Sequence, residues 1–294
     1  MYVIREMEDA LDDCIKGDLK RNDNTVYAWD EAVAFYVGSL EGNDGAGSGT
    51  LLYSLADKRC TNFKTCGEAG NMLGGTSAVN IKIRRAFEAG KNDILNGQCD
   101  QAQVRKVEIE QLMAVPMIQG TLRYSFFRDY ELGEGSERDK IDAEGAVFAA
   151  AVLPLVYACD GPDAKLIYDN MRAGLYDSDF PKVKAAFEAN YACMGVTCAD
   201  VGGLYSVDIA NYFDLAAPCS GDSSSNTGAI VGGVLGGLAG ILILIIAYLK
   251  CGRGGGSSGK DASFSAGTPT PPPTAFMVDS GPETAADAEA NAML

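Results

Sequence analysis

Near the start of this sequence, a phenol and two carboxylates lie within one helical turn, and their oxygen atoms could bind a hard cation. Residues 25–42 read TVYAWDEAVAFYVGSLEG, and helical spacing places Tyr27 and Glu31 on one stripe with Asp30 beside it. The stripe continues in small residues, which leave room for a ligand to approach. The alternative is a solvated acidic face, because most charged side chains of a helix are exposed to water.

Two later segments carry residues of related chemistry. Glu144 shares a helical stripe with Phe148 and Leu155, so the pattern predicts a carboxylate that faces apolar surroundings. Such a carboxylate must be hydrogen-bonded, paired, protonated or bound to a metal. Arg123 and Tyr124 place a positive charge beside a phenol in an acidic chain, which favours contact with an anion. The alternative for this arginine is a structural ion pair with a carboxylate.

The composition excludes several functional classes. The chain has 294 residues, no histidine, and 40 acidic against 24 basic residues, which gives a formal charge of −16. Ser-His-Asp triads, Cys-His pairs and histidine-bound zinc or non-haem iron are therefore excluded. Nucleic acid is a poor partner, because phosphate binding needs a basic surface. A glycosidase with paired carboxylates has little support, since Trp29 is the one tryptophan that could stack on a sugar, and we expect no enzyme.

Apolar residues recur at helical spacing along most of the first 213 residues, and alternating strand patterns are few, so we expect an all-α fold. Within 25–42, the core-facing side is expected to run from Val26 through Trp29 to Leu40. Gly90 is expected to end the helix that Thr76 or Ser77 begins, and Pro116 to kink or divide a longer one. The expected helices are residues 1–22, 25–42, 51–57, 76–89, about 99–128, 164–175 and 180–191.

Three short echoes in the same order predict an internal duplication of helical units. We therefore expect a duplicated helical-bundle ectodomain with repeats at 25–130 and 131–213, preceded by a partial helix at 1–24. The charged segment 131–140 is the expected loop between the repeats. The echoes pair Glu31–Phe35 with Glu144–Phe148, Arg85–Ala89 with Ala185–Ala189, and Cys99–Asp100 with Cys198–Asp200.

Residues 228–249 are predicted to form one transmembrane helix. They are 22 consecutive residues without a charge, which is long enough for the hydrocarbon core of about 30 Å. The basic residues that follow, Lys250, Arg253 and Lys260, predict a cytoplasmic C-terminal side. Glycines within the span favour pairing into a homodimer.

The flanking segments complete a single-pass topology in the plasma membrane. Residues 214–227 form a polar stalk, and 250–294 form a disordered cytoplasmic tail whose proline-rich stretch could bind trafficking proteins. Residues 1–24 lack the apolar core of a signal peptide, so we expect the export signal to be missing from this N-terminus.

Cysteine usage agrees with an exported domain. Eight cysteines precede the span, an even number that favours disulfides in an oxidising compartment. The sequence leaves the pairing open, although Cys60 with Cys66 and Cys193 with Cys198 are close enough for small loops. The ninth, Cys251, is a candidate for palmitoylation or a free thiol.

Four ordered blocks of the sequence resemble a known family. They read WDEAVAFYVGSLEG, LADKRCTNFKTC, VPMIQGTLRY and EGAVFAAAVLPLVYAC, and they resemble the iron-assimilating, low-iron-inducible surface proteins of algae, including the phytotransferrins. The resemblance covers roughly residues 25–198. It implies ferric iron binding at the cell surface with carbonate as synergistic anion, followed by endocytic internalisation. The family is also similar in helical architecture to imelysin-type iron proteins, whose signature histidine is absent here.

This resemblance suggests roles for the oxygen-bearing residues. Ferric iron is a hard cation that oxygen donors suit, so a site without histidine can hold it. Metal binding would release protons from these ligands, so acidification in an endosome should weaken the site. A surface adhesion or scaffold protein without a metal site is the alternative. The candidate metal ligands are Tyr27, Asp30, Glu31, Tyr124 and Glu144, and Arg123 is the candidate anchor for carbonate.

Overall fold

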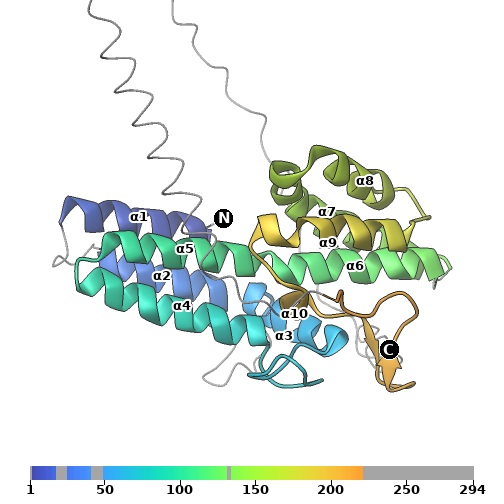
Figure 1. Cartoon of the computed structure of the whole chain (residues 1–294), viewed down its shortest axis with the longest axis horizontal. Coiled ribbons are helices and arrows are strands. Elements are labelled where there is room, and N and C mark those ends of the chain that lie inside the picture. Colours follow the sequence, from blue (N-terminus) through green and yellow to red (C-terminus); the bar gives the residue numbers. More distant parts are fainter. Residues whose placement is uncertain (1, 18–24, 41–48, 131–133, 221–294) are drawn as a thin grey trace, which may run out of the picture. The chain divides into compact units, whose positions relative to one another are not determined.

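Helices make up most of the described part of the chain, as the hydrophobic periodicity predicts (Figure 1). The computed structural model describes residues 2–17, 25–40, 49–130 and 134–220. The predicted membrane span, with its homodimer contact, and the tail with Cys251 lie outside the described residues. The elements are α1 (Tyr2–Lys16), α2 (Thr25–Val37), α3 (Leu52–Phe63), α4 (Ala78–Leu95), α5 (Cys99–Met113), α6 (Val115–Tyr130), α7 (Ser136–Cys159), α8 (Gly161–Met171), α9 (Phe180–Met194), α10 (Cys198–Val201), β1 (Tyr205–Ser206) and β2 (Asn211–Tyr212).

The helices pack as two bundles. Helices α1, α2, α4 and α5 form the first bundle, and α6, α7, α8 and α9 form the second (Figure 1). Helix α3 packs on α2, α4 and α6 and so contacts both bundles. Helices α5 and α6 follow each other end to end across the junction (Figure 1). The predicted division near Pro116 is confirmed: the break falls at Ala114, and Pro116 occupies the first turn of α6, where no backbone N–H is required.

The boundary between the bundles differs from the boundary expected between two repeats. Helix α6 packs on α7 and α9, so it belongs with the second bundle although it precedes residue 131. The expected loop 131–140 is wrong in its second half, because α7 begins at Ser136, directly after Gly135, whose φ is positive at 60°. The first echo lies on the second helix of each bundle, but the next echo pairs α4 with α9, which are the third and fourth helices. Internal duplication therefore stays a hypothesis.

Trp29 fixes the packing of α2 on α4. Its indole is fully buried, and its Nε1 donates a hydrogen bond of 2.9 Å to the Phe87 carbonyl. A Cβ atom on Gly90 would lie 2.2 Å from the indole Cζ2. The prediction that Gly90 ends its helix is therefore wrong: α4 begins after the Ser77 cap and continues through Gly90, which is small enough to receive the ring. The predicted apolar side of α2 is also too long, because α2 ends before Leu40, which is exposed.

Helix α6 is enclosed on nearly every side, so its polar side chains need partners within the protein. Gln119 Nε2 donates to the Val201 carbonyl at 2.9 Å. The Ser125 and Ser178 hydroxyls are 2.7 Å apart. The fully buried Arg128 guanidinium forms an ion pair with Asp142 of α7 at 2.8 Å and donates to the Asn170 carbonyl of α8. The second bundle is thus organised around a helix whose buried Gln119, Ser125 and Arg128 each bond to another element.

All eight described cysteines form disulfides. Cys60 pairs with Cys66, as the spacing suggested, but a small loop between Cys193 and Cys198 is wrong. Cys14–Cys99 ties α1 to α5 within the first bundle, and Cys159–Cys193 ties α7 to α9 within the second. The remaining bond, Cys198–Cys219, holds the C-terminal end of the described chain on α10.

One helix among the described residues, α7, is long and apolar enough to cross a membrane on length and composition alone. Its buried face carries Asp142, paired with Arg128 of α6, and its last residue Cys159 is bonded to Cys193 of α9. These contacts assign α7 to the second bundle.

Gly90→Ala should destabilise the fold by about 2 to 3 kcal/mol, because the added methyl group overlaps the indole of Trp29. Gly161→Ala is the matched control, since its methyl group would lie 3.4 Å from Tyr157, an ordinary contact. Urea unfolding measures both. Equal free energies of unfolding for the two variants would contradict the packing described for Trp29.

The two disulfides that differ most in loop length should differ in their contribution to stability. Removing Cys14–Cys99, which closes a separation of 85 residues, should cost about 4 to 5 kcal/mol in the chain-entropy account. Removing Cys60–Cys66, with a separation of 6, should cost about 2 kcal/mol. Paired Cys→Ser variants unfolded in urea test this order, and a reversed order would contradict it.

Candidate metal-binding site

A phenol and a carboxylate meet where α6 crosses α7. The buried Tyr124 hydroxyl donates a hydrogen bond to Glu144 Oε2, and Glu144 is half-buried. Glycines allow the two helices to approach closely at this point. A Cβ atom on Gly145 would lie 3.0 Å from Tyr124 Cβ, and one on Gly120 would lie 2.5 Å from the Phe148 ring. Gly120 on α6 and Gly145 on α7 thus allow the close helix packing that brings the phenol oxygen and the carboxylate oxygen together.

Two arginines flank this pair. The Arg59 guanidinium carbon, from α3, lies 6.0 Å from the Tyr124 ring centroid and 5.7 Å from that of Phe148. The corresponding carbon of Arg123 lies 5.3 Å from the Tyr124 ring centroid and 4.4 Å from that of Phe127. We call Arg59, Arg123, Tyr124 and Glu144 the Tyr124 cluster. It combines two oxygen donors with two positive charges.

Burial lowers the pKa of Arg59 to about 10, and the negative charge of Glu144 opposes that shift. Arg59 therefore stays charged at neutral pH. Its Nη1 donates to Asn62 at 3.2 Å, while its buried Nε has no hydrogen-bond partner among the described residues. A buried N–H without an acceptor is unfavourable, so an anion that accepted from it would stabilise the site. Arg59 was not among the predicted site residues, although it lies in the block LADKRCTNFKTC that carries the family resemblance.

The donor set suits a hard cation held together with an anion. Phenolate and carboxylate oxygens are ligands that ferric iron favours. Within the described residues no three acidic, cysteine or histidine side chains form a metal-binding group, so further oxygens would have to come from an anion or from water. Arg59 and Arg123 bring positive charge to the Tyr124 ring, which favours an anion beside it.

Tyr27 and Glu31 lie elsewhere, in an acidic cleft between α1 and α2. The cleft has a volume of about 460 Å³, and both side chains are exposed. Sequence analysis missed the acidic residues of α1, whose helical spacing on one face was the available signal. We use the name acidic cleft for the hollow lined by Glu6, Asp9, Asp12, Asp13, Lys16, Tyr27, Ala28 and Glu31.

Asp30 belongs to an ion pair between helices. Its two carboxylate oxygens lie 2.9 and 2.7 Å from Lys91 Nζ of α4. Of the predicted ligands, the structure thus brings together Tyr124 and Glu144, with Arg123 beside them. It places Tyr27 and Glu31 in a second group, on a helix that packs on α1, α3 and α4.

The expected apolar stripe of α7 is partly wrong. The buried face of this helix runs through Asp142, Gly145 and Ala149, whereas Leu155 of the predicted stripe is exposed. Glu144 sits at the border of the buried face. The requirement for a partner is nevertheless met, by the Tyr124 hydroxyl.

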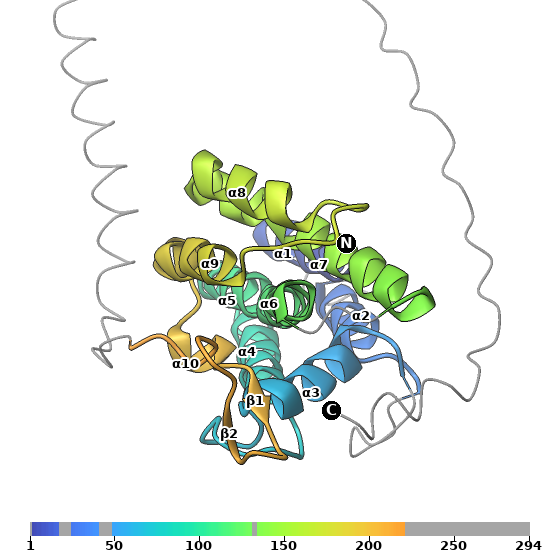
Figure 2. The ribbon, with the colours of Figure 1, turned by 90° about the vertical axis from the view of Figure 1, so that its right-hand side faces the viewer.

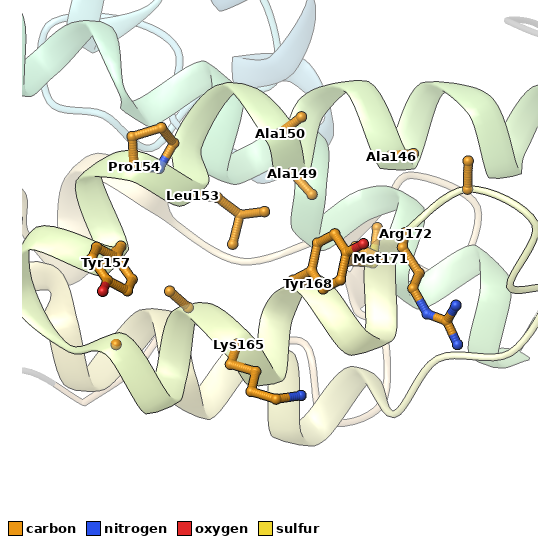
Figure 3. A pocket seen from close by; sticks show the side chains of 13 residues that line it. Ala146, Ala149, Ala150, Leu153, Pro154, Tyr157, Lys165, Tyr168, Met171 and Arg172 are labelled. Atoms are coloured by element: carbon orange, nitrogen blue, oxygen red, sulfur yellow. The ribbon is translucent and has the colours of Figure 1, made fainter.

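A second hollow in the described part of the chain is apolar. It is a groove of about 870 Å³ between α7 and α8, lined by side chains such as Ala149, Leu153 and Tyr168 (Figure 3). Lys165 and Arg172 are its charged lining residues, and Lys165 points away from α7 in Figure 3. Because no carboxylate lines this groove, it does not offer a site for a hard cation.

Comparisons of the chain with protein-family models, with curated proteins and with solved structures find no match.

Proposed function

We propose that this chain is a cell-surface ferric iron-binding protein of iron uptake, with carbonate as synergistic anion and the Tyr124 cluster as the binding site. The observation that supports it is the pairing of a phenol with a carboxylate between two arginines. Iron is the cargo of this protein. The family resemblance of the sequence points to the same cargo and anion.

Charge balance explains why positive charge belongs in such a site. A ferric ion carries three positive charges, whereas a phenolate, a carboxylate and a carbonate together carry four negative charges. Arg59 and Arg123 lie against the same phenol ring and offset the excess negative charge of the ligands and the anion. Removal of either arginine would leave the partly buried anion less well neutralised.

Before iron binds, the Tyr124 hydroxyl donates its proton to Glu144 in a hydrogen bond. Iron would take the place of that proton between the two oxygens, so binding releases a proton. The acidic cleft and the overall charge of −16 would raise the local concentration of cations near the protein. Tyr27 and Glu31 then attract the cargo to the protein, and the Tyr124 cluster binds it.

The cellular setting follows from the predicted span at 228–249. An exported ectodomain attached to the plasma membrane could bind iron outside the cell and carry it inward by endocytosis. Acid in the endosome would return protons to the ligands and release the iron.

Tyr124→Phe and Glu144→Gln should each weaken ferric binding by more than about 100-fold, because loss of an outer-shell partner alone costs 10- to 100-fold. Titration of the purified chain with ferric iron and bicarbonate should give a visible tyrosinate charge-transfer band in the parent chain and no band in Tyr124→Phe. Tyr27→Phe is the matched control and should keep the band. A band lost in Tyr27→Phe and kept in Tyr124→Phe would move the site to the acidic cleft. No band in the parent would contradict iron binding and favour a scaffold role.

Ferric binding should need bicarbonate and should weaken in acid. Protons compete for the phenolate, the carboxylate and the carbonate, so the band should fade as the pH falls below about 6. Arg59→Gln and Arg123→Gln should raise the bicarbonate concentration needed for half-maximal colour. Lys91→Gln, which removes the positive charge facing Asp30 outside the cluster, should leave that concentration unchanged. Binding that is indifferent to bicarbonate would contradict the assignment of the arginines.

A further inference from the structure

The groove between α7 and α8 has no part in the proposed iron site, but its size suits a small organic ligand. Its volume of about 870 Å³ lies in the range of sites that hold such molecules. The α7 side of the groove is built largely from Ala146, Ala149, Ala150 and Pro154. These side chains are short, so they leave the space toward α8 unfilled. Figure 2 shows α8 on the outer side of the second bundle.

Apolar and aromatic side chains in this groove are exposed to water. Leu153 is half-buried, while Tyr157 and Tyr168 are 71% and 52% exposed. A ligand that covered these side chains would remove their apolar surface from water, which favours binding. The groove therefore offers hydrophobic stabilisation that the fold itself does not use.

The groove is elongated. Its lining residues on α7 run from Ala146 to Tyr157, which is about 16 Å of helix at 1.5 Å per residue. Figure 3 shows Tyr157 at one end and Arg172 at the other, with Leu153 and Tyr168 between them. An elongated apolar hollow with a charge at one end suits a chain-shaped amphiphile.

The charged lining residues, Lys165 and Arg172, are both positive, although the whole chain has a formal charge of −16. Lys165 is paired with Asp169, one turn further along α8. The Arg172 guanidinium has no ion-pair or hydrogen-bond partner among the residues that the structure describes. The partial negative charge at the C-terminal end of α8 opposes an anion there, but it is smaller than the full charge of Arg172. Arg172 is thus available to an anionic group.

We propose that this groove binds a fatty acid, with the acyl chain along α7 and the carboxylate on Arg172. Arginine holds a carboxylate through two parallel hydrogen bonds. A helix of a partner protein could also fill an apolar groove, but a single unpaired cation at one end matches a ligand with one terminal anion better. The inference is independent of iron binding, because the groove and the Tyr124 cluster share no residue.

Photolabelling of the full chain tests the proposal. The probe is a myristic acid analogue with a diazirine in its acyl chain, and peptide mass spectrometry locates the labelled residues. In a non-ionic detergent, the label should fall within residues 146–173. Excess myristate should displace it. Myristyl alcohol should displace it much less, because the alcohol lacks the carboxylate that Arg172 would bind.

Two variants test the apolar part of the groove. Ala150→Phe places a ring in the groove, and this should remove most of the label from residues 146–173. Ala151→Phe is the matched control, since Ala151 is exposed on the same helix but is not a lining residue, and the label should stay. Circular dichroism checks that both variants keep their helices.

Two further variants test the charge, and they keep the proposal falsifiable if Ala150→Phe misfolds. Arg172→Gln should raise the probe concentration for half-maximal labelling about 3- to 10-fold, the range expected for a charge-assisted pair at an exposed position. Lys165→Gln should change it by less than about 2-fold, because Asp169 already offsets that charge.

Three results would overturn the proposal. Absence of label from residues 146–173 would exclude a fatty acid from the groove and favour a protein partner. Equal labelling of folded Ala150→Phe and Ala151→Phe would show that the label does not report the groove. Equal displacement by myristate and by myristyl alcohol, with no effect of Arg172→Gln, would exclude a carboxylate on Arg172.

Discussion

Burial of α6 is the constraint on which the second bundle depends. A helix enclosed on most sides must pair each polar side chain within the protein, because unpaired buried groups cost about 1 to 3 kcal/mol each. Gln119, Ser125 and Arg128 find partners on other elements, and Tyr124 finds Glu144. The first three pairs join groups that hold the fold together. The fourth differs because two arginines lie beside its phenol ring.

The same constraint links stability to the proposed chemistry. In the described structure, the hydrogen bond between Tyr124 and Glu144 gives a partner to the buried phenol and to the half-buried carboxylate. A ferric ion would satisfy the same two oxygens, so cargo can enter without leaving either group unpaired. The glycines at the crossing, Gly120 and Gly145, allow α6 and α7 to approach closely at this pair.

The sequence predicted local structure well and convergence of distant residues poorly. Hydrophobic spacing and Pro116 predicted most helices and the α5–α6 break, because these depend on neighbouring residues. The end of α4 could not be predicted from the sequence. Gly90 lies inside the helix, where its lack of a side chain makes room for the indole of Trp29 from α2. The predicted metal ligands come from α2, α6 and α7, and no local sequence pattern shows which of these helices pack together. Asp30 was predicted to bind a metal, but it pairs with Lys91 of α4, a contact that only the packing of the two helices creates. Arg59 was missed because α3 reaches the Tyr124 cluster only through tertiary packing.

The position of Trp29 has a consequence for how unfolding can be observed. The indole belongs to the first bundle and packs against Phe87, with ring centroids 5.8 Å apart. Intrinsic tryptophan emission therefore reports the first bundle, whereas circular dichroism sums the helices of both bundles. The disulfides Cys14–Cys99 and Cys159–Cys193 each close within one bundle, so covalent continuity between the bundles passes through the backbone at Ala114. The separation between the two optical transitions would measure the cooperativity that α3 and the α5–α6 junction transmit from one bundle to the other.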